Sequence, residues 1–349
     1  MARFLIFRTP VLKVALMALL LAVLSACGSP QSTFDPKSDV ADSILSIYIL
    51  VTVVASIVGF LVLVAMVWLL IRFRAKPGVA ARQIHGNNKL EVAWTIAPIL
   101  VLLVIGIPTM FWIEGSAREP APDVLEVEAI GHQWWFEYHY PGLGPDGTDL
   151  ITANELIVPV GRDVRVTLQS DDVIHSFWIP QLVGKTDMIP GRTNVLHTFN
   201  VYEVGTYYGQ CAEFCGEAHA LMRFRVHAKT TSDFNSWVAA HNAGPATPEP
   251  GTAAARGALA FASCSGCHAV SGTAAQGRIG PDLSLFGERT TLAAGVLENS
   301  DQNLRAWISD VRSFKPIPEG ARFMPTFNAM LDETQIADIS AYLRSLTAE

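Results

Sequence analysis

The chain has 349 residues, half of them hydrophobic, and a formal net charge of −7. This length allows two or three domains, and the hydrophobic fraction is high for a purely soluble protein. The absence of a basic patch in the sequence argues against nucleic-acid binding. Between Glu114 and Lys229, Asp and Glu outnumber Lys and Arg by 16 to 8. Such a surface would attract a basic partner, although ordinary solvation of a soluble domain gives the same charge balance.

The first apolar segment runs from Val14 to Leu24 and follows three basic residues, as in a secretory signal peptide. It ends in Leu24-Ser25-Ala26-Cys27, which resembles a bacterial lipobox. The resemblance implies removal of residues 1–26 and attachment of lipid to Cys27. The alternatives are an ordinary signal peptide with a stray cysteine or an uncleaved helix, because short motifs match by chance.

Two longer apolar segments, about 44–71 and 92–113, contain no charged residue. Each exceeds the roughly 20 residues that span a bilayer, which predicts a two-helix transmembrane hairpin within residues 27–116. A buried helix of a soluble protein is the alternative, and it rarely has this length. The basic residues between the segments are Arg72, Arg74, Lys76, Arg82 and Lys89. By the positive-inside rule this loop is cytoplasmic, so the rest of the chain faces the periplasmic side of a bacterial cytoplasmic (inner) membrane.

Residues 117–241 are predicted to form a β-sandwich. Segments such as 124–129 and 164–168 are rich in β-formers, and Pro-Gly and Asp-Gly turn signals separate them. Several short strands with this punctuation are typical of a sandwich.

Residues 242–251 are rich in Pro, Gly and Ala and predict a linker that its prolines stiffen. Residues 252–349 are then helical in character. The sequence from Asp332 to Gln335 is typical of a helix start, and Ile336, Ile339 and Leu343 follow on one helical face.

The twelve residues from Cys211 to Met222 contain two cysteines, a histidine and a methionine. Sulfur ligands and imidazole suit copper, and two thiolates on one loop can bridge two metal ions. His175 follows a predicted strand and would supply a second imidazole, although a His flanked by apolar residues is more often a core residue. A disulfide between Cys211 and Cys215 is the main alternative in an exported domain. A zinc or blue-copper site with a single cysteine is a further one.

The sequence Cys264-Ser-Gly-Cys267-His268 is the attachment signature of c-type haem, with His268 as an axial iron ligand. A redox-active Cys-x-x-Cys or half of a zinc site is the alternative. Met324, followed by proline, resembles the sixth ligand of small class I cytochromes c, and Met330 is the competing candidate.

Residues from about 39 to 229 resemble subunit II of haem–copper cytochrome c oxidases. The resemblance rests on the helical hairpin and on four motifs: Gly131–Trp135, His175–Phe177, Lys185–Arg192 and Cys211–Met222. It implies a cupredoxin-like β-sandwich that holds the binuclear copper centre CuA. By position, it implies the ligands His175 and His219 (terminal), Cys211 and Cys215 (bridging), Met222, and the backbone carbonyl of Glu213.

The same resemblance implies three further roles. Trp134 would be the residue through which electrons enter CuA, unless it is only a core or interface aromatic. The side chain of Glu213 would bind a magnesium ion shared with subunit I. Glu91 would lie near the entrance of a proton path in the partner subunit, or would be only a carboxylate favoured by a helix N-terminus.

Residues from about 251 to 346 resemble an all-α class I cytochrome c. The implied fold is a multidomain membrane protein with a transmembrane hairpin, a cupredoxin-like sandwich and a cytochrome c domain, as in caa-type oxidases. The resemblance implies electron transfer from cytochrome c or a cytochrome bc complex, through haem c and CuA, to subunit I. There oxygen is reduced to water with proton translocation, and subunit III is a further expected partner. The alternatives are the electron-input subunit of a nitric or nitrous oxide reductase and a copper-handling lipoprotein.

Overall fold

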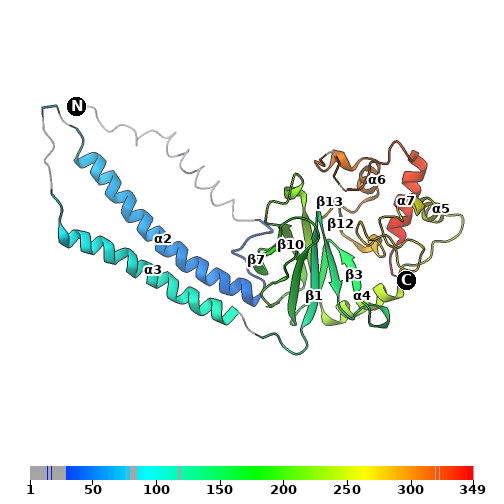
Figure 1. Ribbon diagram of the computed structural model, residues 1–349, viewed down its shortest axis with the longest axis horizontal. Helices are drawn as coiled ribbons and strands as arrows, with labels where there is room; N and C mark the ends of the chain where they lie inside the picture. The colour runs from blue at the N-terminus through cyan, green and yellow to red at the C-terminus, as the bar shows by residue number, and fades with distance from the viewer. Residues whose placement is uncertain are drawn as a thin grey trace.

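The computed structural model describes residues 29–75, 77–78, 85–116, 119–318, 320–321 and 323–348, together with Val14 and Met17. Cys27 and the predicted signal segment, apart from Val14 and Met17, lie outside the described residues. Three parts follow one another along the long axis: a helical hairpin, a β-sandwich and a helical C-terminal domain (Figure 1).

The hairpin consists of α2 (Asp39–Arg72) and α3 (Asn88–Ser116), which contain the two predicted spans. Ser38 is the N-cap of α2, and its side chain accepts a hydrogen bond from the backbone amide of Ala41. At 1.5 Å per residue both helices exceed the roughly 30 Å of a bilayer core. No residue of their most apolar segments is buried in the isolated chain, as expected of helices whose apolar side chains face lipid or another subunit.

The sandwich has two sheets (Figure 1). The first sheet has the order β3-β2-β1-β5-β8, with β9 also paired to β5, and comprises β1 (Leu125–His132), β2 (Trp135–Tyr140), β3 (Leu150–Ala153), β5 (Asp163–Ser170), β8 (Asn194–Val195) and β9 (Phe199–Asn200). The second sheet has the order β4-β11-β10-β6-β7 and comprises β4 (Glu155–Pro159), β6 (His175–Ile179), β7 (Val183–Met188), β10 (Gly205–Cys211) and β11 (Arg223–Lys229). The pairs β1–β5 and β4–β11 are parallel, and the other pairs are antiparallel.

Aromatic side chains join the two sheets. Phe136 of the first sheet meets Phe177 and Phe224 of the second edge to face, at ring-centroid distances of 5.5 and 5.0 Å. Phe177 and Phe224 stack on each other at 4.4 Å, and all three rings are fully buried. Such packing makes the sandwich a rigid frame, because aromatic pairs add to the free energy gained by burial of their area.

The C-terminal domain is built on α5 (Ala253–Ala260), α6 (Asp301–Ser309) and α7 (Glu333–Ser345). The predicted helix start is confirmed, because Asp332 and Gln335 form a reciprocal capping box. Helices α5 and α7 cross closely at Gly257, where an added Cβ would lie 1.9 Å from the Asp338 carbonyl oxygen. The remaining elements of the C-terminal domain are η3 (Phe261–Ser263), η4 (Phe286–Glu288), β12 (Thr291–Leu292), β13 (Leu297–Glu298) and η5 (Val311–Ser313).

Helix α4 (Thr231–Ala243) leaves the sandwich and leads into the proline-rich segment. The shorter elements η1 (Pro145–Gly147) and η2 (His219–Leu221) belong to sandwich loops. The C-terminal domain packs directly on the sandwich. Glu155, 5% exposed, accepts hydrogen bonds from the amides and hydroxyls of Thr290 and Thr291 at 2.7–3.2 Å. The proline-rich sequence alone leaves the pose of this domain open, and these contacts define it.

Candidate metal centre and cofactor cavity

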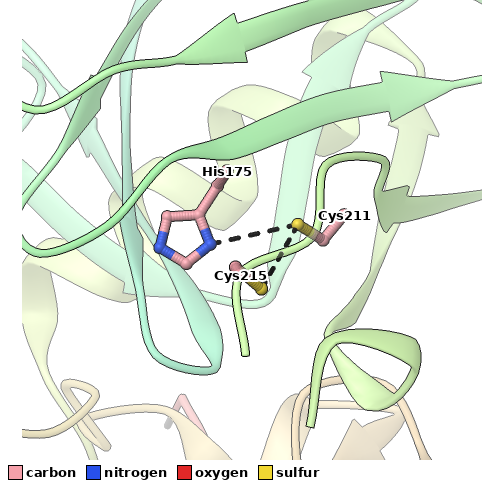
Figure 2. Close-up of side chains that lie close together, drawn as sticks. All are labelled: His175, Cys211 and Cys215. Carbon is pink, nitrogen blue, oxygen red and sulfur yellow. Dashed lines mark hydrogen bonds between the residues drawn. The ribbon is translucent and has the colours of Figure 1, made fainter. Parts of the chain in front are cut away.

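Two sulfurs and an imidazole converge at one end of the second sheet (Figure 2). Ligand atoms of His175, Cys211 and Cys215 all lie within 4.8 Å of one another, and all three residues are buried. The two Sγ atoms are 3.7 Å apart, and His175 Nδ1 is 3.9 Å from Cys211 Sγ. Strand pairing explains the convergence, because β6 begins at His175, β10 ends at Cys211, and the two strands are neighbours.

The loop after β10 brings the other predicted donors to the same place. His219 Nδ1 lies 3.6 Å from Cys215 Sγ, and Met222 Sδ lies 3.8 Å from it. The Glu213 carbonyl oxygen is 3.3 Å from Cys211 Sγ. The other four predicted donors therefore lie around the pair of sulfurs. Two thiolates, two imidazoles, a thioether and a carbonyl form a donor set that suits copper.

The cysteines are free thiols, so the disulfide alternative does not apply to this structure. Their sulfur separation of 3.7 Å is far from the roughly 2.05 Å of a disulfide bond. The hydrogen bond with Cys215 lowers the pKa of Cys211 to about 3, while the same contact and burial raise the pKa of Cys215. Metal binding requires deprotonated thiols, so a bound cation would take the place of their protons.

Asp172 fixes the orientation of His175. Its Oδ1 lies 2.8 Å from His175 Nε2, which leaves Nδ1 directed at the cysteines. Burial is the largest single influence and disfavours the charged imidazole, but the interactions with Asp172 and Cys211 together raise the pKa of His175. Carboxylates that hold the far nitrogen of a metal-binding histidine are the usual outer support of such sites. The sequence analysis missed Asp172, although an acidic residue three positions before a candidate ligand was a usable signal.

Trp134 lies against the metal cluster and is 2% exposed. Its Nε1 donates a hydrogen bond to the Cys215 carbonyl at 3.1 Å, and Gln133 Nε2 donates to the same oxygen at 2.7 Å. On its other side the indole meets the Phe323 ring of the C-terminal domain, at a centroid distance of 6.0 Å. Trp134 therefore connects the cluster to the second domain.

A cavity of about 740 Å³ lies between the two domains. The cavity is lined by Cys264, Cys267, His268 and Met324, and Gln133, Trp134 and Trp135 form part of the sandwich wall. Its size falls within the roughly 300–1,000 Å³ typical of ligand and cofactor sites. The attachment signature and the candidate sixth ligand thus face one space that can hold a haem.

His268 is prepared to bind a metal through one nitrogen. Its Nδ1 lies 2.8 Å from the Pro281 carbonyl, which leaves the lone pair of Nε2 available to bind a metal. Burial lowers the pKa of His268, so the imidazole is neutral, as iron ligation requires. Gly280 allows this approach, because an added Cβ would lie 2.7 Å from His268 Cε1. Met324 lines the same cavity, whereas Met330 is 60% exposed and is absent from the described lining.

The Glu213 side chain and Glu91 are not among the donors of this cluster. Glu213 uses a side-chain oxygen locally, accepting a hydrogen bond from the Phe214 amide at 3.1 Å. Glu91 lies in the first turn of α3 and accepts a hydrogen bond from the Asn87 amide at 3.1 Å. Glu91 thus stabilises the start of a helix in this structure.

Comparison with known proteins gives the same three parts. Residues 32–111 match the cytochrome c oxidase subunit II transmembrane domain, residues 143–229 match its periplasmic domain, and residues 254–347 match cytochrome c. Each match describes one part of the chain, and the order of the parts is the order seen in the fold.

Full-length relatives extend this result. The cytochrome c oxidase subunit 2 of Alkalihalophilus pseudofirmus is 37% identical over 90% of this chain and 90% of its own length. The Bacillus subtilis protein of the same name is 35% identical over 96% of this chain and 98% of its own length. A solved periplasmic domain of oxidase subunit II from Bradyrhizobium japonicum is 32% identical, covers 36% of this chain and 96% of its own, and has a TM-score of 0.33.

The fold and the site define a membrane-anchored electron-transfer subunit. The chain belongs to the cytochrome c oxidase subunit 2 family and carries a fused C-terminal cytochrome c domain. It is therefore part of an oxidase complex and associates with subunit I. The periplasmic-domain match implies copper CuA, and the cytochrome c match implies haem c.

Proposed function

We propose that the donor cluster described above holds both coppers of CuA. Cys211 and Cys215 would be the bridging ligands, His175 and His219 the terminal ligands, and Met222 and the Glu213 carbonyl would complete the donor set. The donor distances of 3.3–3.9 Å among the sulfurs and their neighbours support this assignment, because they leave space for ions between the donor atoms. Asp172 keeps His175 in place from outside.

The C-terminal cavity holds the haem. Cys264 and Cys267 would form the thioether bonds, and His268 and Met324 would be the axial ligands. Pro281 fixes the tautomer of His268, so that Nε2 is the donor to iron. Apolar side chains such as Phe261, Leu283 and Phe327 exclude water from the cavity.

The observation that carries the proposed function is a series of contacts that joins the haem site to the copper site. Phe323 is the chain neighbour of Met324 and packs on Trp134, whose indole is hydrogen-bonded to the Cys215 carbonyl. When bound, haem and copper supply one-electron redox chemistry, and electrons pass from the haem site to the copper site on the way to subunit I. The residues of this chain keep the two sites at a fixed separation and exclude water between them.

The outer connections belong to the same proposal. The electron donor is a cytochrome c or a cytochrome bc complex. It docks on the haem domain, because Trp134 is buried under that domain and an external donor cannot contact it directly. The Glu213 side chain contributes to a magnesium site at the subunit I interface, Glu91 lies near a proton path, and subunit III joins the complex. The two large domains lie on the periplasmic side of a bacterial cytoplasmic membrane, and Cys27 anchors the N-terminus through lipid.

The test is metal and haem quantitation on the purified chain, together with a redox spectrum. The expected composition is two coppers and one covalent haem per chain. Cys215→Ser should abolish the mixed-valence copper signal and leave the haem content unchanged. One exchangeable copper without covalent haem would contradict the proposed function, and loss of both centres in the variant would indicate misfolding.

A further inference from the structure

Lys315 is a buried cation between the two redox sites. It follows η5 in the C-terminal domain, is 2% exposed, and donates from Nζ to the Trp134 carbonyl at 3.0 Å. An ammonium group has three N–H donors, and this contact uses one of them. Burial of a charge is costly unless the charge is paired or fully hydrogen-bonded.

The described residues offer no carboxylate partner to this ammonium group. The ion pairs found among them do not include Lys315, and burial lowers the pKa of Lys315 to about 7. The Cys215 thiol is the titratable group that raises this pKa, and it does so only partly. Within the described part of the chain, the surroundings of Lys315 therefore compensate little of the free-energy cost of burying its charge.

Lys315 also lines the cavity that contains Cys264, Cys267 and His268. A haem attached through its vinyl groups keeps both propionates free, and these carboxylates are anions that the cofactor brings into the cavity. Arg278 and Arg289 also line the cavity, and Lys315 is the cation in its wall that donates to the Trp134 carbonyl. The remaining N–H groups of the Lys315 ammonium can donate to a propionate carboxylate. Such charge-assisted hydrogen bonds are stronger than those between neutral groups.

We propose that Lys315 binds a haem propionate and, through the same ammonium group, the backbone carbonyl of Trp134. This inference rests on the proposed haem site and adds a residue that positions the cofactor. Lys315 then holds the propionate edge of the haem beside the residue that contacts the copper loop. It also places a positive charge near the haem, which favours the reduced state.

The test uses the full chain with both cofactors bound. The haem reduction potential is measured by spectroelectrochemistry for the unchanged protein and for Lys315→Met, Lys315→Arg and Lys229→Met. The proposal predicts that Lys315→Met lowers the ratio of reduced to oxidised haem at a fixed potential by about tenfold, or ~59 mV for a one-electron couple. Lys315→Arg should keep the ratio near its original value. Lys229→Met removes a lysine outside the cavity lining described above and should change nothing.

Infrared redox difference spectra with haem labelled with ¹³C at the propionate carboxylates give a second readout. The labelled carboxylate band should move in Lys315→Met, and also in Lys315→Arg, because a guanidinium is a different donor. Unchanged bands and an unchanged potential would overturn the proposal. Should Lys315→Met not bind haem, the band of Lys315→Arg decides alone. Covalent haem is counted by pyridine haemochrome in the unchanged protein, where the proposed function predicts one haem per chain. Absence of haem there would contradict the proposed function, whereas absence in Lys315→Met alone would not.

Discussion

The indole Nε1 of Trp134 donates a hydrogen bond to the backbone carbonyl of Cys215 at 3.1 Å, across 81 residues of sequence. This contact joins a residue of the first sheet's β1–β2 turn to the loop that carries both candidate bridging thiols. On the opposite side of the indole lies Phe323, next to the candidate axial ligand Met324. One aromatic pair and one hydrogen bond thus link the loop of candidate copper ligands to the segment that carries Met324.

Trp134→Phe tests this contact. The variant keeps an aromatic ring and loses the N–H, so the electronic coupling through the Cys215 carbonyl should fall. Electron transfer from haem to copper is expected to slow by about tenfold, equivalent to ~1.4 kcal/mol of barrier. Flash photolysis of the two-cofactor chain measures the rate. Trp237→Phe is the matched control, since Trp237 packs on Tyr140 and is absent from the described lining of the haem cavity. Equal rates in the two variants would remove Trp134 from the path.

Asp172→Asn tests the outer support of the copper site. The substitution weakens the hydrogen bond to His175 Nε2, and losses of this kind typically reduce metal affinity by about 10–100-fold. Competition with a copper chelator measures the effect. Asp171→Asn is the control, because the neighbouring Asp171 is exposed and its carboxylate lies near His132 instead. An affinity in Asp172→Asn equal to that of the control would show that His175 is held by other contacts.

Met324→Leu and Met330→Leu distinguish the two candidate axial ligands. Only Met324 lines the cavity, while Met330 is exposed. Met324→Leu should lower the haem reduction potential and remove the sulfur–iron absorption, because a thioether opposite histidine raises the potential. Met330→Leu should leave both unchanged. The reverse pattern would place the sixth ligand at Met330.

Glu155→Gln tests the contact between the domains. The carboxylate accepts hydrogen bonds from Thr290, Thr291 and His227, and loss of its charge should cost about 1.5–3 kcal/mol. Thermal unfolding of the C-terminal domain and protease sensitivity of residues 242–251 report the change. Glu203→Gln, on an exposed carboxylate of the same domain, is the control. An unfolding midpoint like that of the control would mean that other contacts fix the domains.

The Glu155 contact also has a defined pH dependence. Burial alone would raise the pKa of this carboxyl, but the hydrogen bonds from His227, Thr290 and Thr291 lower it from 4.5 to about 2. A lowered folded-state pKa means that the stabilisation is complete above about pH 4.5 and is lost as the pH falls towards 2. The difference in unfolding midpoint between the unchanged protein and Glu155→Gln should shrink over this range. A difference that is constant down to pH 2 would contradict the assignment.

The parts of the molecule that the sequence predicts are those whose signals are local. The spans of α2 and α3, the capping of α7 and the donors from Cys211 to Met222 each depend on residues close together in the chain. His175 is proposed as a second imidazole because it follows a predicted strand, but its core-histidine alternative stays open in the sequence, since strand pairing brings it to Cys211 over 36 residues.

The interdomain contacts could not be predicted in this way. Lys315 meets Trp134 across 181 residues and Glu155 meets Thr290 across 135, and neither pair has a local sequence signal. Their roles follow from how one folded domain packs on another, and a sequence read segment by segment does not contain that information.

The most direct test of the central claim is a time-resolved reduction of the two cofactors in one chain. Haem is reduced by a light pulse, and the copper absorption is followed as the protein concentration is varied. If the docked domains form one continuous path, copper reduction is first order with a rate independent of concentration. A rate that rises in proportion to protein concentration would mean that electrons pass between molecules, and the proposed path within the chain would be wrong.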